Sequence, residues 1–260
     1  MIPTIVQRIS LILTLVIIAA LLPIAPALAA DGKEAQQSTD LERSRIEQII
    51  RNYLLDNPEL LVEVMRKLEA RQKREEEAGL VGKIMANRKA LFASADDFVV
   101  NPAGAIPVVE FFDYQCGYCK RFTPIVTRLL ATDKTVRFVF KEFPILGKMS
   151  VVASRAALAA KMQGKYQAFH DAMMGLRRGL TEAMIYQTAT DVGLDIDRLK
   201  KDMTRPEIMQ TIQANRKLAE ALGIRGTPSI VIGEQLAPGA ISYEQLTALI
   251  EQARASCSVC

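Results

Sequence analysis

The sequence predicts an α/β fold with a helical insertion, preceded by a helical arm. One observation is a short apolar pattern at residues 107–113, which leads directly into a Cys-X-X-Cys motif and a helical pattern up to residue 132. A second β pattern follows at residues 136–142, and strand, helix and strand in this order form a β-α-β unit with parallel strands. The other observation is a helical stretch at about 148–222, followed by patterns for a final strand region and a helix.

The first 29 residues have the three parts of a secretory signal peptide. Arg8 precedes an apolar run over residues 9–22, and Ala27-Leu28-Ala29 forms a small-residue cleavage site, so the mature chain is expected to begin at Ala30. A membrane anchor is the alternative. The uncharged run has 14 residues, whereas a bilayer-spanning helix needs about 20.

Residues 30–95 are expected to form a helical arm. Apolar residues recur at helical spacing over 41–54 and again over 61–68, and Asp56-Asn57-Pro58-Glu59 separates the two stretches, with Asn57 as the expected N-cap of the second helix. Such a helix cannot bury its own apolar face, so it must pack either on another copy of itself or on its own domain. Self-association is the favoured alternative.

Residues 96–256 are expected to form one catalytic domain that contains the insertion. Thr181 and Pro206 mark helix starts within the insertion. After it come a strand at residues 229–232, a turn at Gly233-Glu234, a further short strand, and a last helix that Ser242 caps and that runs to Ala255. The formal net charge is +4, or +3 without Arg8, and the chain has no Trp, which gives no basic footprint for nucleic acid.

Cys116-Gly117-Tyr118-Cys119 carries the chemistry that the sequence predicts. At the start of a helix, free backbone N–H groups and the helix dipole favour negative charge on Cys116, and the thiolate is the reactive species in disulfide exchange. Cys119, one turn later and more buried, can then attack the mixed disulfide. A local disulfide or half of a zinc site are the alternatives, but no second ligand pair lies at zinc-ribbon spacing.

A second pair, Cys257 and Cys260, lies at the end of the sequence as Cys-Ser-Val-Cys. Three interpretations stay open for it: a local disulfide in a mobile tail, a second exchange site, or a soft-metal site for Cu(I), which paired thiolates suit.

Four segments resemble the DsbA family of periplasmic thioredoxin-like proteins, over about residues 96–256. They are Val-Glu-Phe-Phe-Asp-Tyr-Gln-Cys-Gly-Tyr-Cys-Lys at 109–120, Phe-Lys-Glu-Phe-Pro-Ile-Leu-Gly at 140–147, Gly-Lys-Tyr-Gln-Ala-Phe-His-Asp-Ala-Met at 164–173 and Gly-Ile-Arg-Gly-Thr-Pro-Ser at 223–229. The resemblance implies a thioredoxin-like fold, a periplasmic location and a redox-active disulfide between Cys116 and Cys119 as the only redox group. It also implies protein substrates with free or mispaired cysteines, and a membrane thiol-redox partner of DsbD or DsbB type.

The resemblance also implies roles for residues outside the motif. Thr227-Pro228 would be a cis peptide beside the cysteines, where the Thr227 backbone pairs with an extended substrate; an ordinary turn proline is the alternative. Glu110 matches a buried family acid that moves protons beneath the cysteines, and Lys141 on the neighbouring strand is its expected partner, unless the two face solvent. His170 is expected to be a packing residue, since a lone histidine supplies neither a triad nor a metal cluster.

Departures from the family's oxidases favour isomerisation. Gly117-Tyr118 replaces a dipeptide that usually contains histidine, and together with Thr227 it resembles DsbC-type disulfide isomerases. The arm resembles that of oligomeric, trimeric relatives associated with suppression of copper sensitivity, which makes a homo-oligomer, a trimer or a dimer, the expectation. A dithiol oxidase, a periplasmic copper-binding protein and an oligomeric chaperone remain alternatives.

Overall fold

The computed structural model describes residues 31–177 and 179–256, which form two compact units that divide at Ala70. The expected signal peptide and the Cys257/Cys260 pair lie outside the described residues. Within those residues, no helix combines the length and the apolar character that crossing a membrane requires.

The first unit consists of helix α2 (Asp31–Asp56) and the first part of α3 (Glu59–Ala86). The break between them falls at Asn57-Pro58, as expected. Asn57, however, does not form the expected side-chain cap of α3: its side-chain amide donates to the carbonyl oxygen of Tyr53 at 2.8 Å. The same carbonyl accepts the backbone N–H of Asn57 at 3.0 Å, so both donors of Asn57 cap the end of α2.

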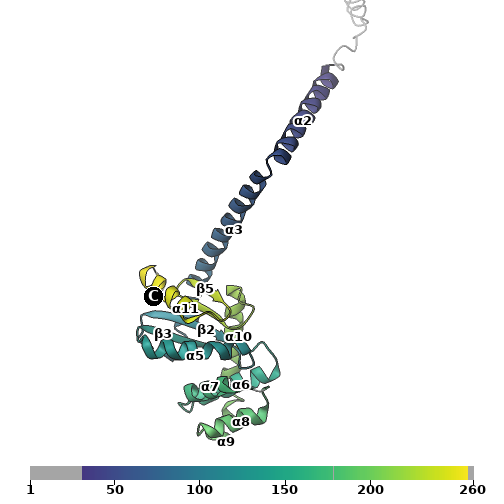
Figure 1. Ribbon diagram of the computed structural model, residues 1–260. Coiled ribbons are helices and arrows are strands. Elements are labelled where there is room, and N and C mark those ends of the chain that lie inside the picture. Colours follow the sequence, from purple (N-terminus) through teal and green to yellow (C-terminus); the bar gives the residue numbers. More distant parts are fainter. Residues whose placement is uncertain (1–30, 178, 257–260) are drawn as a thin grey trace, which may run out of the picture. The chain divides into compact units, whose positions relative to one another are not determined.

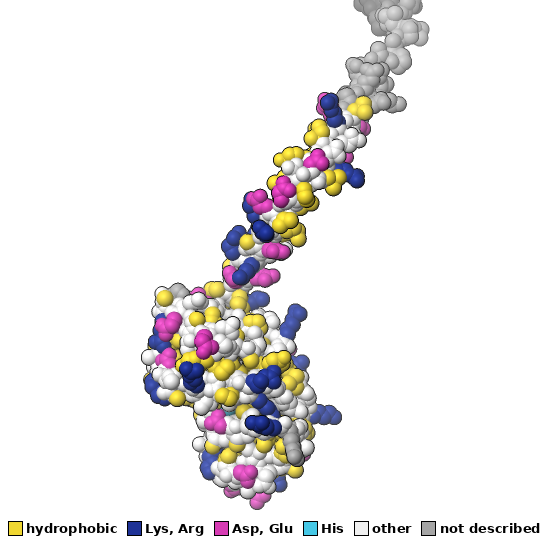
Figure 2. All heavy atoms as spheres, viewed as in Figure 1, with side chains coloured by type: hydrophobic (Ala, Val, Ile, Leu, Met, Phe, Trp, Pro, Cys, Tyr) yellow, Lys and Arg dark blue, Asp and Glu magenta, His cyan; other side chains and the backbone are white. Residues whose placement is uncertain are grey.

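Large apolar side chains of the first unit are exposed on both helices, and Figure 2 shows them in yellow along this segment. Among the described residues of this unit, α2 and α3 leave these side chains largely uncovered. The residues at least 50% exposed are Leu41, Ile46, Ile49, Ile50, Tyr53, Leu55, Leu61, Val62, Val64 and Met65.

The second unit is built on a five-stranded mixed sheet (Figure 1). Strands β2 and β3 are parallel and central, as the β-α-β prediction requires, and the other three strands pair antiparallel in the order β1-β3-β2-β4-β5. Their bounds are Phe98–Val100 for β1, Ile106–Phe112 for β2, Val136–Glu142 for β3, Ser229–Ile232 for β4 and Gln235–Pro238 for β5. Only β1 has no counterpart in the sequence-based prediction.

Helices cover both faces of the sheet. Helix α5 (Gly117–Thr132) and α11 (Tyr243–Ser256) share one apolar cluster with the side chains of β2 and β3 that point to their face. On the other face, the end of α3, α4 (Arg88–Phe92) and α10 (Pro206–Leu222) pack against the alternate side chains of the same strands. Ile84, Leu91 and Phe92 are buried there, so the expected boundary at residue 95 divides residues that share one core.

The insertion forms a helical group of its own beside α5 (Figure 1). It contains α6 (Lys148–Lys161), α7 (Tyr166–Gly175), α8 (Glu182–Asp191) and α9 (Ile196–Asp202). The predicted helix starts are confirmed: the Thr181 hydroxyl accepts from the Met184 N–H at 3.3 Å, and Pro206 is the first residue of α10. Helix α10, which was expected within the insertion, returns to cover the sheet.

Candidate active site

Cys116 is the N-cap residue of α5, directly after the loop that follows β2. Its sulfur accepts a hydrogen bond from the backbone N–H of Cys119 at 3.3 Å. The side chain of Tyr118 projects into solvent and is 61% exposed, and the guanidinium of Arg121 lies 4.2 Å from the centre of its ring. The N-terminal end of the helix therefore directs a backbone donor at the sulfur of Cys116, as the sequence predicts.

The Thr227-Pro228 peptide bond is cis and lies beside Cys116. The Cys116 thiol donates to the carbonyl oxygen of Thr227, with 3.2 Å between sulfur and oxygen. A groove of about 560 Å³ adjoins this contact, with Tyr118, Pro228 and Pro238 in its wall. The expectation of a cis peptide next to the motif is confirmed, and the groove gives room for an extended chain beside Thr227.

Cys119 is fully buried, whereas 5% of Cys116 is exposed, and both are free thiols. Burial raises the pKa of Cys119 strongly, and the nearby charge of Glu110 raises it further. Glu110 is also buried, and burial raises its pKa to about 8. It lines a cavity of about 450 Å³ between the sheet, α5 and α7. Glu110 is thus a buried carboxyl close enough to Cys119 for its charge to affect the pKa of that thiol.

Lys141 is not the partner of Glu110, which corrects the prediction. In the parallel register of β2 and β3, Lys141 is opposite Phe111, so its side chain points to the other face of the sheet. There it forms a buried ion pair with Asp97 and donates to the carbonyl oxygen of Ala90 at 2.5 Å. Lys141 therefore has no contact with the cysteines through which to act in catalysis.

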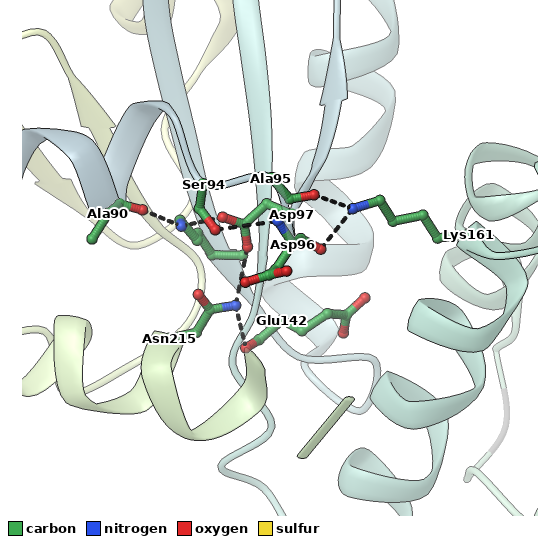
Figure 3. Close-up of polar contacts among 9 residues, drawn as sticks. Ala90, Ser94, Ala95, Asp96, Asp97, Glu142, Lys161 and Asn215 are labelled. Atoms are coloured by element: carbon green, nitrogen blue, oxygen red, sulfur yellow. Dashed lines mark hydrogen bonds and ion pairs between the residues drawn. The ribbon is translucent and has the colours of Figure 1, made fainter. Parts of the chain in front are cut away.

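Asp97 is the centre of this second polar cluster, shown in Figure 3. It follows α4 and precedes β1, and besides Lys141 it accepts from the side-chain amide of Asn215 on α10 at 3.3 Å. Lys161 of α6 donates to the backbone of the same segment at Ala95 and Asp96. These contacts bind the segment between α4 and β1 to strand β3 and to helices α6 and α10.

Asp113 is a site residue that the sequence analysis did not identify. It follows β2, is fully buried, and its carboxylate accepts from the backbone N–H of Gln115 at 2.7 Å and from the Ser150 hydroxyl at 2.7 Å. The bond to Gln115 is the local turn that aspartate often makes two residues ahead. An aspartate between a strand and the motif therefore predicts the turn, but it does not predict the hydrogen bond with Ser150.

His170 is buried among aromatic rings, with the Phe140 and Phe112 ring centres at 4.6 and 4.9 Å. Burial lowers its pKa to about 3, so the imidazole is neutral, and its Nδ1 lies 3.2 Å from the Tyr114 hydroxyl. Tyr114 also donates to Glu142 at 3.2 Å. The prediction of a packing residue is confirmed. Among the described residues, no three Cys, His, Asp or Glu side chains gather as a metal site.

Two family models match the chain. The DSBA-like thioredoxin domain matches residues 107–251, more than half of the chain, and the copper resistance protein ScsC N-terminal domain matches residues 42–75. Among curated proteins, the Na(+)/H(+) antiporter NhaA 3 of Salinispora tropica is 29% identical over 163 residues, which cover 62% of this chain and 25% of that protein. The chain thus spans about a quarter of the length of the curated relatives it matches.

Three solved structures extend the comparison. A thioredoxin-like oxidoreductase from Silicibacter pomeroyi is 44% identical, with a TM-score of 0.65 over 66% of this chain and 99% of that one. Proteus mirabilis ScsC in a compact conformation is 28% identical, with a TM-score of 0.62 over 82% and 98%. A periplasmic thioredoxin-like protein from Salmonella enterica serovar Typhimurium is 29% identical, with a TM-score of 0.57 over 65% and 96%. The ScsC likeness reaches into the first unit.

Proposed function

The chain belongs to the family of DSBA-like thioredoxin domain proteins, and we propose that it catalyses thiol-disulfide exchange in exported proteins, with isomerisation as its main reaction. One observation carries this proposal. The Cys116 sulfur lies 3.3 Å from the Cys119 N–H and 3.2 Å from the Thr227 carbonyl oxygen, at the edge of the groove beside the cis peptide.

The reaction begins with the dithiol form. The Cys116 thiolate attacks one sulfur of a substrate disulfide, a Cys116–substrate disulfide forms, and the second substrate sulfur leaves as a thiolate. The N–H of Cys119 stabilises the charge on the Cys116 sulfur before the attack. Thr227 and the adjoining groove hold the substrate chain extended beside the reacting sulfur.

Two steps can then release the substrate. If another substrate thiolate attacks the mixed disulfide, the substrate is re-paired, Cys116 leaves as a thiolate, and no net oxidation occurs. If Cys119 loses its proton and attacks Cys116, the enzyme is oxidised to the Cys116–Cys119 disulfide and the substrate leaves reduced by two electrons. A dithiol partner protein, of the membrane-bound kind, must then return two electrons to the enzyme.

The burial of Cys119 favours the first of these steps. Because burial raises its pKa, the thiol of Cys119 rarely ionises at neutral pH, and the mixed disulfide persists long enough for the substrate to rearrange. Glu110 is the group proposed to accept the Cys119 proton when Cys119 does attack. We place this enzyme in the periplasm, with residues 1–29 as its signal peptide, and assign oligomerisation to the exposed apolar residues of α2 and α3.

Refolding of a substrate with scrambled disulfides tests the proposal. The reduced full chain is expected to restore substrate activity, and the Cys116→Ser variant is expected to have no effect above the rate in glutathione buffer. Equal rescue by the Cys116→Ser variant would show that the chain acts as a chaperone without exchange chemistry. Strong oxidation of a reduced substrate by the pre-oxidised chain, with no rescue of scrambled substrate, would identify an oxidase.

A further inference from the structure

The carboxylate of Asp113 joins two loops at the active site. It lies three residues before Cys116 and is fully buried. One oxygen accepts from Gln115 N–H and Ser150 Oγ, and the other accepts from the backbone N–H groups of Ile145 and Leu146 at 2.8 and 2.9 Å. Among the described residues, no cation lies within ion-pair distance of it, although the charge of Lys120 acts on it from farther away. Four hydrogen bonds are therefore its direct compensation for burial.

The side chain of Gln115 forms a second connection between the same loops. Its amide donates to Ser150 Oγ at 2.8 Å and lies 3.5 Å from the carbonyl oxygen of Leu146. Gly147 follows with φ +140°, a conformation that favours glycine, and a Cβ atom there would lie 3.4 Å from the Gln115 amide nitrogen. The loop after β3 is thus held tightly against the residue that precedes Cys116.

This loop exposes apolar side chains to solvent, although hydrogen bonds to Asp113 fix its backbone. Ile145 is 36% exposed and Leu146 is 50% exposed, while the N–H groups of both are bound to a fully buried carboxylate. We call these two residues the apolar rim. Apolar side chains that are held rigidly at the edge of a site lose little conformational entropy when a ligand covers them, which favours their use in recognition.

We infer that Asp113 is a positioning residue for substrate recognition, because it fixes the apolar rim relative to Cys116. The substrate class that this arrangement fits is an extended peptide with a large apolar residue close to its reactive cysteine. The inference rests on the proposed exchange function and deepens it. A small disulfide that reaches only Cys116 and Thr227 does not contact the rim, so the contribution of Asp113 is specific to peptide substrates.

Steady-state exchange by the full chain, with dithiothreitol as the dithiol that returns two electrons per turnover, tests this inference with two substrates: the mixed disulfide of glutathione with a leucine-containing cysteine peptide, and glutathione disulfide. For Asp113→Asn, the KM for the leucine peptide is expected to rise about tenfold, the equivalent of about 1.4 kcal/mol. Its kcat, and the rate with glutathione disulfide, are expected to stay within twofold of wild type. A peptide with glycine in place of leucine is expected to bind both proteins equally weakly.

Two further variants make the outcome decisive. Asp133→Asn is the control, because Asp133 at the far end of α5 also accepts a backbone N–H and a hydroxyl, both from Thr135, in addition to its ion pair with Arg254; it is expected to behave as wild type in both exchange assays. Ser150→Ala keeps the carboxylate but removes the hydroxyl between Asp113 and Gln115, and is expected to raise the same KM by a smaller factor. If circular dichroism shows that Asp113→Asn does not fold, the KM of Ser150→Ala for the leucine peptide still tests the inference.

The inference is overturned if both substrates lose activity equally in the folded variants, or if the leucine peptide loses none. Failure of the wild-type chain to turn over either substrate is a different result. It would contradict the proposed exchange function, and the inference would be abandoned with it.

Discussion

The two cysteines of the motif differ in burial, and this difference assigns their order of action. Cys116 is at the edge of the groove, whereas Cys119 is fully buried above Glu110, where burial holds its pKa high. A substrate sulfur can reach only Cys116. Cys119 can attack only the Cys116 sulfur of the mixed disulfide. The Cys116–Cys119 bond then forms and the substrate sulfur leaves as a thiolate, which makes Cys119 the group that releases substrate.

Replacing the buried cysteine is therefore expected to trap the substrate. For Cys119→Ser, we expect covalent Cys116–substrate complexes to accumulate on a non-reducing gel, because the internal attack is lost while the external attack remains. Isomerisation of a scrambled substrate should persist, since another substrate thiol can still release the complex. Cys116→Ser is the control and should give no complexes. Complete loss of isomerisation in Cys119→Ser would mean that release by Cys119 is part of every turnover.

Glu110 is expected to destabilise the protein above pH 4.5. Its pKa is 4.5 in the unfolded chain and about 8 in the folded one, so the unfolded state loses the proton first and stability falls as pH rises between these values. Glu110→Gln removes this titration. At pH 7 we expect the variant to be more stable by on the order of 3 kcal/mol, from about 1.4 kcal/mol per pH unit, and the gain to vanish near pH 4.

Urea unfolding at pH 4, 5.5, 7 and 8 measures this gain. Glu69→Gln is the control, because it makes the same substitution at an exposed glutamate in the first unit. A constant difference between Glu110→Gln and wild type from pH 4 to 8 would contradict a raised pKa at Glu110. The same proteins test catalysis: release of substrate by Cys119 should accelerate towards pH 8 in wild type and lose that dependence in Glu110→Gln.

Among the elements, β3 carries side chains to both faces of the sheet, and its register decides their roles. Lys141 packs on the side of α4 and α10, where its ammonium group forms an ion pair with Asp97 and donates a hydrogen bond to the carbonyl oxygen of Ala90. Burial lowers the pKa of Lys141 and raises that of Asp97, and the ion pair opposes both shifts. This pair is a structural link between the segment before β1 and the sheet.

Loss of this link is expected to affect stability and not chemistry. Lys141→Met leaves the Asp97 carboxylate buried without its cation, which should lower the free energy of unfolding by about 3 kcal/mol. The rate of exchange per folded molecule should stay within twofold of wild type, because Lys141 is on the face opposite Glu110. The double variant Asp97→Asn/Lys141→Met removes both charges and should recover most of the stability. A tenfold slower exchange in folded Lys141→Met would restore a catalytic role to this lysine.

The elements with strong patterns could be predicted from sequence, and those set by tertiary pairing could not. The β-α-β unit, the insertion and the last helix follow from apolar periodicity and from caps such as Thr181. Strand β1 has only three residues and exists because it pairs with the edge of β3, from Phe98 opposite Phe140 onward. The same limit applies to the arm, since nothing local in the sequence shows that Ile84 is buried against the sheet.

The residues of the candidate site also differ in how far the sequence alone predicts them. The cysteine pair and Thr227-Pro228 are recognisable as motifs with a known local setting. Which strand residue faces Glu110 depends on register, and a shift by one residue reverses the face, so Lys141 could not be placed from sequence. Asp113 gives a local turn signal, but its bonds to Ile145 and Ser150 join segments more than 30 residues apart.

On the scale of the whole molecule, the first unit and the thioredoxin-like unit have different surfaces. The second unit buries its apolar side chains in two clusters around the sheet. The first unit leaves Ile46, Ile49 and Tyr53 more than half exposed at helical spacing, and its residues 42–75 match the ScsC N-terminal domain. Exposed apolar stripes of this length are expected to pack against further copies of the same helix.

Isomerisation should depend on this association, because a mispaired substrate must be held while its other cysteines find Cys116 or each other. In the full chain, Ile49→Glu places a charge in the apolar stripe and is expected to yield a monomer by light scattering. Recovery of scrambled substrate should fall at least tenfold, while exchange with glutathione disulfide stays within twofold. Gln48→Glu is the matched control, since it adds the same charge one residue away on an exposed polar position. A monomeric Ile49→Glu variant that isomerises as well as wild type would separate the arm from the reaction.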